Sequence, residues 1–346
     1  MDFTRIIFSL FAVFIVLNSP ALAQVGGFAG EFTRVGFGPR GMALGNAMVA
    51  VADEGSYAHY NPALAARPSN GEIQLDISTS IMEFDRQMHN VNAQFRVSPT
   101  ANLSIGLINA RVNDIDGRTA SGFRTESLST DEYQVLSNFG FRLSETIWAG
   151  IGFKINLADF ADDVSTTTSV GLDAGFYAEV IDGLTVGAAI QDLFASYDTD
   201  TSDLFGDNAG STEQNFPTRF KFGAAYRPDL KWLVSTEYEI RSQSSDVTRS
   251  VTELFEGVPT IRTLTEEVNT SSQFLRFGSS YLAHERITVR SGFQLLDLEN
   301  DTESVFSAGF SLHLPFDKFK PSVDYAFFRE PNNISSIHVF ALRLHL

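Results

Sequence analysis

The sequence predicts an all-β protein, a single antiparallel transmembrane β-barrel of about 14 strands with an N-terminal segment plugging its lumen. Three observations lead to this prediction. Apolar residues alternate with small or polar residues over stretches of about 10 to 13 residues. The connections between these stretches are alternately short and long, and no apolar run after Leu22 is long enough for a transmembrane helix.

The composition excludes several other classes of protein. The chain has 346 residues, of which 43% are hydrophobic, with 31 Phe and 26 Gly. This aromatic content is too high for a disordered chain. There is no cysteine, which rules out disulfides and thiolate metal sites. The net charge of −17 argues against a nucleic-acid partner, because phosphate binding requires a basic face.

The N-terminus has the pattern of an export signal. Arg5 precedes an apolar run from Ile6 to Leu17, and Ala21-Leu22-Ala23 is a small-residue cleavage site. This run is shorter than the roughly 20 residues of a spanning helix. We therefore expect a cleaved signal peptide at 1–23, a plug segment at 24–68 and the barrel at 69–346. The alternative is an uncleaved N-terminal anchor.

The predicted strands are long enough to cross a membrane. In one of them, Ile151, Phe153 and Ile155 alternate with Gly152 and Lys154. Strands in soluble proteins are most often about 5 to 6 residues long, whereas tilted membrane strands need about 9 to 11. The expected ranges are 72–84, 88–98, 102–113, 131–143, 146–159, 166–180, 184–194, 217–227, 231–242, 272–282, 286–297, 303–314, 319–329 and 335–346.

The connections predict how the barrel is oriented. Every second connection is a turn of a few residues, and several of the others are long and polar, namely 114–130, 195–216 and 243–271. Outer-membrane barrels have short periplasmic turns and long external loops. We therefore expect a protein of the cell outer membrane with both termini in the periplasm. Closure of the barrel would leave no unpaired strand edge in the hydrocarbon.

The segment from Val25 to Arg67 lacks strand alternation and is rich in Gly, Ala and other apolar residues. An apolar segment of this kind would be an aggregation liability in water. A 14-stranded barrel is also wider than side chains alone can fill. We expect the segment to occupy the lumen, although docking on an external partner is the alternative. The residues that we assign to the plug are Arg40, Gly41, Met42, Gly45, Asp53, Asn61 and Pro62.

Within this plug, Arg40 and Asp53 are expected to pair with lumen charges of opposite sign. Asn61-Pro62 is expected to turn the chain towards the first strand.

Charged residues also lie on the strand face opposite the apolar stripes. Glu237 and Glu239 are one strand away from Lys221 and one strand away from Arg276, so cross-strand pairing would help to set the register. These charges could form a salt-bridge ladder that fills the barrel or a selectivity filter for a solute. The assigned lumen charges are Lys154, Arg219, Lys221, Glu237, Glu239, Arg276, Arg290, Asp324 and Arg343.

Three motifs invite a chemical interpretation. The G-x-G-x-x-G at 36–41 lacks the acidic residue about 20 positions further on that a dinucleotide site requires, so a packed plug loop is expected. The acidic run at 198–203 has Asp203 where a calcium loop needs Gly. No H-E-x-x-H or G-x-S-x-G motif occurs. We therefore expect no enzymatic activity, no metal and no cofactor.

Residues 32–53, the following His59-Tyr-Asn-Pro-Ala-Leu-Ala65 and the later segment 217–226 resemble the PorV/PorQ family, within the wider FadL-like group of outer-membrane barrels. The match is best in the first 40 residues after the signal, and Pro39 and Asn46 depart from the usual family pattern. The resemblance implies a 14-stranded barrel with its N-terminal segment inside the lumen. PorV-type members handle cargo proteins in type IX secretion, and FadL-like relatives pass hydrophobic small molecules.

The leading expectation is therefore a non-enzymatic barrel that supports protein export or outer-membrane assembly. The alternative is a FadL-like channel for hydrophobic small molecules. The expected partners are outer-membrane lipid and lipopolysaccharide, together with secretion or cargo proteins or hydrophobic ligands. A lumen packed with charges would favour export, and an apolar pocket beside the N-terminal segment would favour the channel.

Overall fold

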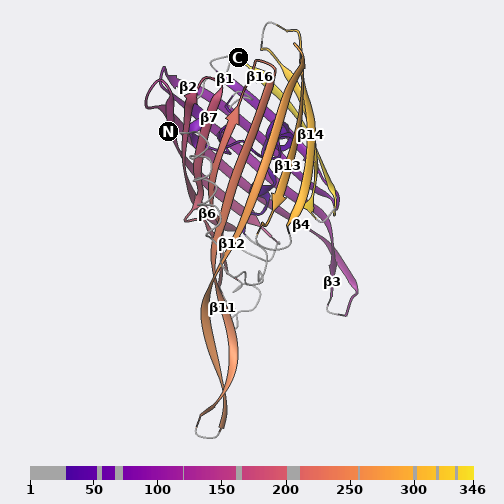
Figure 1. Cartoon of the computed structure of the whole chain (residues 1–346). Coiled ribbons are helices and arrows are strands. Elements are labelled where there is room, and N and C mark those ends of the chain that lie inside the picture. The colour runs from indigo at the N-terminus through magenta and orange to yellow at the C-terminus, as the bar shows by residue number, and fades with distance from the viewer. Residues whose placement is uncertain are drawn as a thin grey trace.

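Fourteen strands form one closed antiparallel barrel, in which the first strand, β1, pairs with the last, β16 (Figure 1). The computed structural model describes residues 29–52, 57–66, 73–119, 121–160, 166–200, 211–255, 258–298, 302–316, 319–331 and 334–346. The predicted fold class is confirmed. The predicted signal peptide at 1–23 lies outside the described residues.

The barrel strands follow one another around the wall in chain order. They are β1 (Ile73–Ile81), β2 (Arg86–Ser98), β3 (Ala101–Arg118), β4 (Arg124–Arg142), β5 (Ile147–Asp159), β6 (Thr167–Ile181), β7 (Leu184–Leu193), β10 (Thr218–Tyr226), β11 (Trp232–Phe255), β12 (Val258–His284), β13 (Ile287–Leu296), β14 (Glu303–His313), β15 (Ser322–Arg329) and β16 (Ser336–His345).

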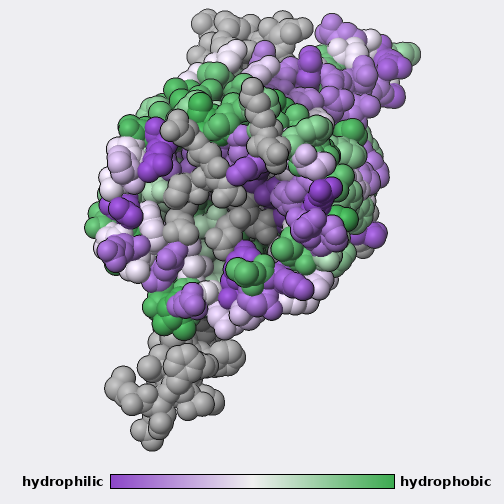
Figure 2. All heavy atoms as spheres, turned by 90° about the horizontal axis from the view of Figure 1, so that it is seen from above, coloured by the Kyte–Doolittle hydropathy of each residue, from purple (hydrophilic) through white to green (hydrophobic). Residues whose placement is uncertain are grey.

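The alternation in the sequence separates the two faces of the wall. Phe153 and Phe222 point outwards and are 44% and 53% exposed, whereas their neighbours Lys154 and Lys221 point inwards and are 1% and 3% exposed. Successive side chains of a strand project to opposite faces, so one sequence builds an apolar exterior and a polar interior. Hydrophobic residues accordingly gather on the outer wall in the view down the barrel (Figure 2).

The two ends of the barrel differ as the connection lengths predict. The C-terminal end of β16 lies at the same end as the short turns, and the hairpins β3–β4 and β11–β12 extend from the other end (Figure 1). We call these the short-turn end and the long-hairpin end.

The strands that flank the predicted connections at 114–130 and 243–271 are longer than expected, because their pairing continues into these ranges. β11 and β12 pair without interruption from Trp232↔Tyr281 to Phe255↔Val258, so a two-stranded ribbon continues well beyond the barrel. β3 and β4 likewise continue to the pair Arg118↔Arg124. Thr occurs repeatedly in both segments and Val in 243–271, and both residue types favour extended pairing. The sequence interpretation ended these strands at the membrane thickness, although pairing continues beyond it.

The predicted loop at 195–216 contains a small separate hairpin, formed by β8 (Ser196–Asp200) and β9 (Ser211–Asn215). Tyr197 of β8 packs edge-on against Phe216 at 4.9 Å between ring centroids, and both side chains are buried with Ala29. Of the acidic run considered for calcium, Asp198 lies in β8, and Ser202 and Asp203 lie outside the described residues.

Among the residues that the structure describes, the N-terminal segment contains three short helical elements. These are α2 (Phe32–Val35), α3 (Gly38–Ala43) and the 3-10 helix η1 (Pro62–Ala66). In the described part of the chain, no helix is both long and apolar enough to cross a membrane.

Candidate functional site

The N-terminal residues 29–52 and 57–66, which we call the plug, lie inside the barrel. Met42, Leu44, Met48 and Leu64 are completely buried. α3 contacts β13 to β16 and β1, whereas η1 contacts β3 to β6, so the plug reaches opposite sides of the wall. The strands thus shield the apolar side chains of the plug from water.

Glycines on the inward face of the wall provide the space for the plug. They occur as cross-strand partners, because Gly150 pairs with both Gly140 and Gly175, and Gly278 pairs with Gly292. A Cβ atom at any of these positions would come within 3.0 Å of plug atoms. Glycine weakens a strand, and its presence there often marks close approach of another backbone. We call the five residues Gly140, Gly150, Gly175, Gly278 and Gly292 the glycine seats. In the sequence these glycines appear only as small residues that alternate with apolar ones.

The plug also needs a glycine of its own. Gly45 adopts a positive φ of 62°. A Cβ atom added to it would lie 3.0 Å from the carbonyl oxygen of Phe277 and 3.0 Å from the backbone nitrogen of Phe293. A side chain at this position would be strained in its own conformation and would press on the wall. Gly41 packs against the Tyr60 ring within the plug.

A carboxylate of the wall binds the plug backbone directly. Glu237 Oε2 accepts hydrogen bonds from the N–H groups of Met48 and Val49, at 2.9 and 2.8 Å. Asn61 Nδ2 donates to the carbonyl oxygen of Val49 at 2.8 Å and to that of Phe176 on β6 at 2.9 Å. The turn at Val49 is therefore held by both the wall and the rest of the plug.

The predicted pairing of Arg40 with a lumen carboxylate is present. Arg40 Nε lies 3.2 Å from Asp324 Oδ2 on β15, and Arg40 Nη2 donates to Ser322 Oγ at 2.9 Å. Met42 packs in an apolar cluster with Ala326 and Val339. Asp53 lies outside the described residues.

Asn61 and Pro62 lie at the start of η1, whereas the link from η1 to β1 falls outside the described residues, so the predicted turn towards the first strand stays a prediction. Asn61 Oδ1 accepts from the N–H of Ala63 at 3.0 Å, and Pro62 is the first residue of η1. Both residues rest on the glycine seats Gly150 and Gly175.

The lumen charges on β10 to β12 form one buried network. Arg276 Nη1 lies 2.9 Å from Glu237 Oε1 and 2.7 Å from Glu239 Oε2, and Lys221 Nζ lies 3.8 Å from Glu239. Arg241 also pairs with Glu239. The register places Lys221 opposite Glu239 and Glu237 opposite Arg276, as the sequence predicts.

A second network lies on β5, β6, β7 and β10. Lys154 Nζ lies 2.7 Å from both Asp173 and Asp192, and Arg219 Nη2 lies 2.6 Å from Asp192. Strict alternation turns Asp192 outwards, because its neighbour Gln191 faces the lumen, and the sequence analysis therefore missed it. The β6–β7 register shifts at Leu172/Ala174, and Asp192 adopts a φ of 62°. The side chains of Gln191 and Asp192 are therefore both buried. Bulges commonly redirect a side chain in this way.

The remaining lumen charges are Arg343 on β16, at the seam where the barrel closes, and Arg290 on β13. Arg343 on β16 pairs with Asp76, its register partner on β1. Arg290 donates to Ser311 Oγ at 2.7 Å. Asp76 was not identified from the sequence, although its inward parity on the first predicted strand was the available signal.

These networks bring oppositely charged groups together in buried positions. Buried charges are tolerated when they are paired and hydrogen-bonded, because isolated ions lose their hydration. The described residues contain no group of three or more His, Asp and Glu side chains placed to hold a metal ion. The G-x-G-x-x-G stretch leads into α3 inside the barrel, without a β–α–β unit.

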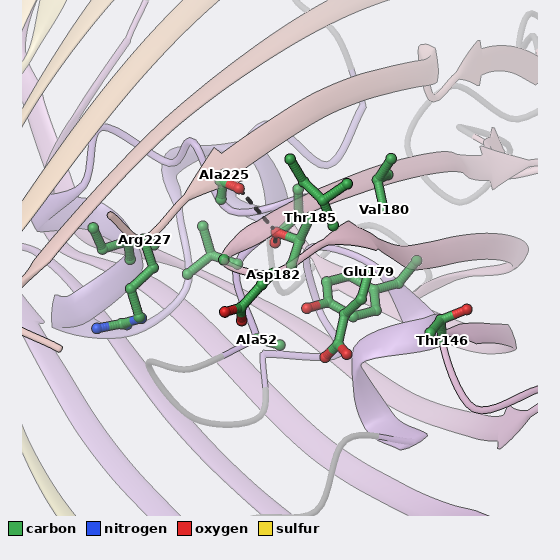
Figure 3. Close-up of a pocket in the computed structure, with 14 residues that line it drawn as sticks. Ala52, Thr146, Glu179, Val180, Asp182, Thr185, Ala225 and Arg227 are labelled. Carbon is green, nitrogen blue, oxygen red and sulfur yellow. Dashed lines mark hydrogen bonds between the residues drawn. The ribbon is translucent and has the colours of Figure 1, made fainter. Parts of the chain in front are cut away.

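A pocket of about 360 Å³ lies at the short-turn end between the plug and the wall (Figure 3). The plug contributes Ala50, Val51 and Ala52. Tyr177, Ala225 and Leu233 come from the wall, and Glu179, Asp182 and Arg227 are its charged lining residues. Thr185 Oγ1 donates to the carbonyl oxygen of Ala50 at 2.8 Å, which holds this edge of the plug to β7.

Comparison with solved structures identifies the same fold in hydrocarbon channels. The Ralstonia pickettii toluene transporter TbuX aligns with a TM-score of 0.64 and 14% identity, over 91% of this chain and all of that one. The CymD monoaromatic hydrocarbon channel gives 0.59 and 14%, over 90% and 96% of the two chains. A Pseudomonas aeruginosa FadL homologue gives 0.60 and 10%, over 89% and 97%.

The chain thus has the FadL-like barrel fold. No family model matches the sequence, and no curated protein does.

Proposed function

We propose that the protein is a non-enzymatic channel of the outer membrane that admits apolar small molecules, with the plug controlling passage. The observation that carries this proposal is the shared architecture with toluene and monoaromatic hydrocarbon channels, which extends over nine-tenths of the chain.

The proposal includes the placement of the chain in the membrane. The outward Phe, Leu, Ile and Val side chains would face lipid, and the short-turn end would face the periplasm. Residues 1–23 would be the cleaved signal. The buried ion pairs would be structural rather than a selectivity filter, because their charges neutralise one another away from any open pore.

Protein export is the second candidate function, and two observations favour it. The plug and the ion-pair networks fill the lumen, and the β11–β12 ribbon extends beyond the barrel, where a partner protein could reach it. The resemblance to PorV/PorQ proteins adds support, but its specific residues lie almost entirely within the plug. In this case, no apolar solute would pass.

Uptake of labelled toluene distinguishes the two functions. Host cells whose outer membrane lacks such a channel would express this protein, and uptake would be measured at low toluene concentration. We expect faster uptake than in cells that carry the empty vector. Unchanged uptake, together with secretion or cargo proteins that co-purify from native membranes, would support export instead.

Planar-bilayer conductance tests the role of the plug. Gly150→Val would insert a side chain into the backbone of Pro62, and we expect it to raise a conductance that is near zero in the unsubstituted protein. Gly171→Ala is the matched control, because its added Cβ would meet only ordinary contacts with Ala195 and Lys154. Deletion of residues 25–58 should give a large, steady conductance. Equal conductance in the deletion and the full chain would remove the plug from the proposal.

Cysteine labelling tests the orientation, since the chain contains no cysteine. An impermeant reagent on intact cells should label Ser121→Cys, between β3 and β4, but not Asp229→Cys, in the turn before β11. Equal labelling at both positions would contradict the proposed orientation.

A further inference from the structure

The outer wall carries a groove where β1 pairs with β2 on one side and with β16 on the other. Its volume is about 290 Å³. The apolar side chains that line it point outwards and are each at least 40% exposed, namely Ile77, Val91, Phe340 and Leu342. They therefore offer apolar surface to a molecule that lies outside the barrel.

One end of this groove, here the seam groove, is polar. Thr79 Oγ1 lies 2.9 Å from His89 Nδ1, and both residues line the groove. The Tyr325 hydroxyl on β15 lies 2.9 Å from His338 Nδ1 on β16. Phe340 is the register partner of both Thr79 and Tyr325. Two hydroxyl–imidazole pairs thus flank one aromatic ring on the outer wall.

The polarity of the seam groove has a direction along the barrel. β1 begins at the short-turn end, so Thr79 lies nearer the long-hairpin end than Ile77 does. β2 runs the opposite way, so His89 lies nearer that end than Val91 does. His338 is the third residue of β16, which also begins there. The groove is therefore apolar towards the short turns and polar towards the long hairpins.

The two imidazole rings can donate to a ligand at the polar end. When the hydroxyl donates to Nδ1, the neutral ring carries its proton on Nε2. No described residue hydrogen-bonds to the Nε2 atom of His89 or His338. Polar groups on a lipid-facing wall are costly unless they have partners. Phosphate oxygens are suitable acceptors, because hydrogen bonds to charged oxygens are the stronger ones.

We propose that the seam groove binds a phosphorylated, acylated glycolipid of the outer leaflet, namely the lipid A part of lipopolysaccharide. An acyl chain would lie against Ile77, Val91 and Leu342, and a phosphate would accept from His89 and His338. This inference rests on the proposed placement of the long-hairpin end outside the cell. A phospholipid of the inner leaflet would carry its phosphate towards the other end of the groove.

The test is lipid binding to the delipidated full-length protein in detergent, which does not depend on whether the barrel conducts. The chain has no cysteine, so Ile81→Cys can carry a single environment-sensitive dye. Ile81 is 52% exposed and is the register partner of His338. The probes are diphosphoryl lipid A, dephosphorylated lipid A and phosphatidylethanolamine in mixed micelles. We expect a saturable signal with diphosphoryl lipid A and at least about fivefold weaker binding of the other two.

Matched substitutions test the two ends of the groove. Val91→Phe would fill the apolar end, and Val289→Phe on β13 is its control, because the two valines are 40% and 41% exposed. His89→Leu with His338→Leu removes both donors. His284→Leu, an exposed histidine outside the groove, is the control for this pair. Val91→Phe and the double variant should each weaken lipid A binding about fivefold or more, whereas the controls should not. Heat-modifiable gel migration verifies that every variant is folded.

Three results would overturn the proposal. They are the absence of a saturable signal with diphosphoryl lipid A, equal affinity for lipid A and phosphatidylethanolamine, and equal losses in the groove variants and their controls. Toluene uptake is a separate measurement, so failure of the channel proposal would leave the binding result unaffected. Cysteine labelling that contradicted the orientation would remove the assignment to lipopolysaccharide, whatever the uptake.

Discussion

Two sides of the lumen bury different kinds of polar side chain. The inward faces of β5 to β7 and β10 to β12, here the charged wall, carry Lys154, Asp173, Asp192, Arg219, Lys221, Glu237, Glu239 and Arg276. The inward faces of β2 to β5, here the amide wall, carry Asn90, Asn92, Ser104, Gln134, Asn138 and Asn156. Both walls are buried, but only the first holds groups that must remain charged.

The two walls differ in how completely their groups are connected. On the charged wall, Glu237 contacts Arg276 and two plug N–H groups, and Glu239 contacts three cations. On the amide wall, Gln134 Nε2 donates to Asn156 Oδ1 at 2.7 Å, while Gln134 Oε1 and Asn156 Nδ2 have no hydrogen-bond partner among the described residues. Unpaired charge is far more costly to bury than an unpaired amide. The charged wall therefore holds the plug firmly, and the amide wall tolerates change.

The largest effect is expected at the seam that joins the two ends of the sheet. Deletion of Arg343 to Leu346 removes the Arg343–Asp76 pair and three of the eight register pairs between β1 and β16. Two strand edges would then be open in lipid, which the hydrocarbon does not tolerate. We expect no folded barrel in the outer membrane, as assessed by heat-modifiable gel migration. Normal levels of the truncated protein would show that neither wall depends on closure.

The next largest effect is expected on the charged wall. Glu239→Ala leaves Arg276, Arg241 and Lys221 without their shared carboxylate and should lower the free energy of unfolding by about 3–5 kcal/mol. Denaturant titration in lipid vesicles measures this loss. Combining the change with Arg276→Met should recover part of it. If Glu239→Ala lowered the free energy of unfolding by less than about 1 kcal/mol, the charged wall would be no more sensitive to substitution than the amide wall.

The outer face of the same sheet gives an intermediate effect. Phe222 is the outward neighbour of Lys221, and Phe222→Arg should cost about 2–4 kcal/mol near the bilayer midplane. The cost arises because the charge would face lipid without a partner. Unchanged assembly and heat-modifiable migration of this variant would argue that the face does not contact hydrocarbon.

The smallest effect is expected on the amide wall. Asn156→Ala removes the acceptor of a single Gln134 bond, and a typical hydrogen bond contributes about 0.5–1.5 kcal/mol. The same unfolding titration should therefore show a loss of about 1 kcal/mol, well below that for Glu239→Ala. A loss as large as that of Glu239→Ala would mean that the amides form a connected network.

Much of this architecture follows from local sequence. Period-2 alternation located all fourteen barrel strands, because a wall between lipid and a polar lumen requires two different faces along every strand. Parity placed Glu237, Glu239, Lys221 and Arg276 on the inner face, and the one-strand separation between them predicted the network that the register confirms. Arg40 was assigned a lumen partner because a buried charge needs one.

The remaining features depend on contacts between distant parts of the chain. Asp192 faces the lumen because the pairing of β6 with β7 shifts by a bulge, which alternation along one strand cannot reveal. The β11–β12 ribbon is long because each strand finds its partner beyond the barrel. The glycine seats have their role only because residues 44–45 and 61–66, which lie more than 70 positions earlier in the chain, approach them. Alternation along one strand indicates which face of the wall each residue occupies. The bulges, the glycine seats and the lengths of strand pairing depend on close packing between segments that come together only when the barrel closes around the plug.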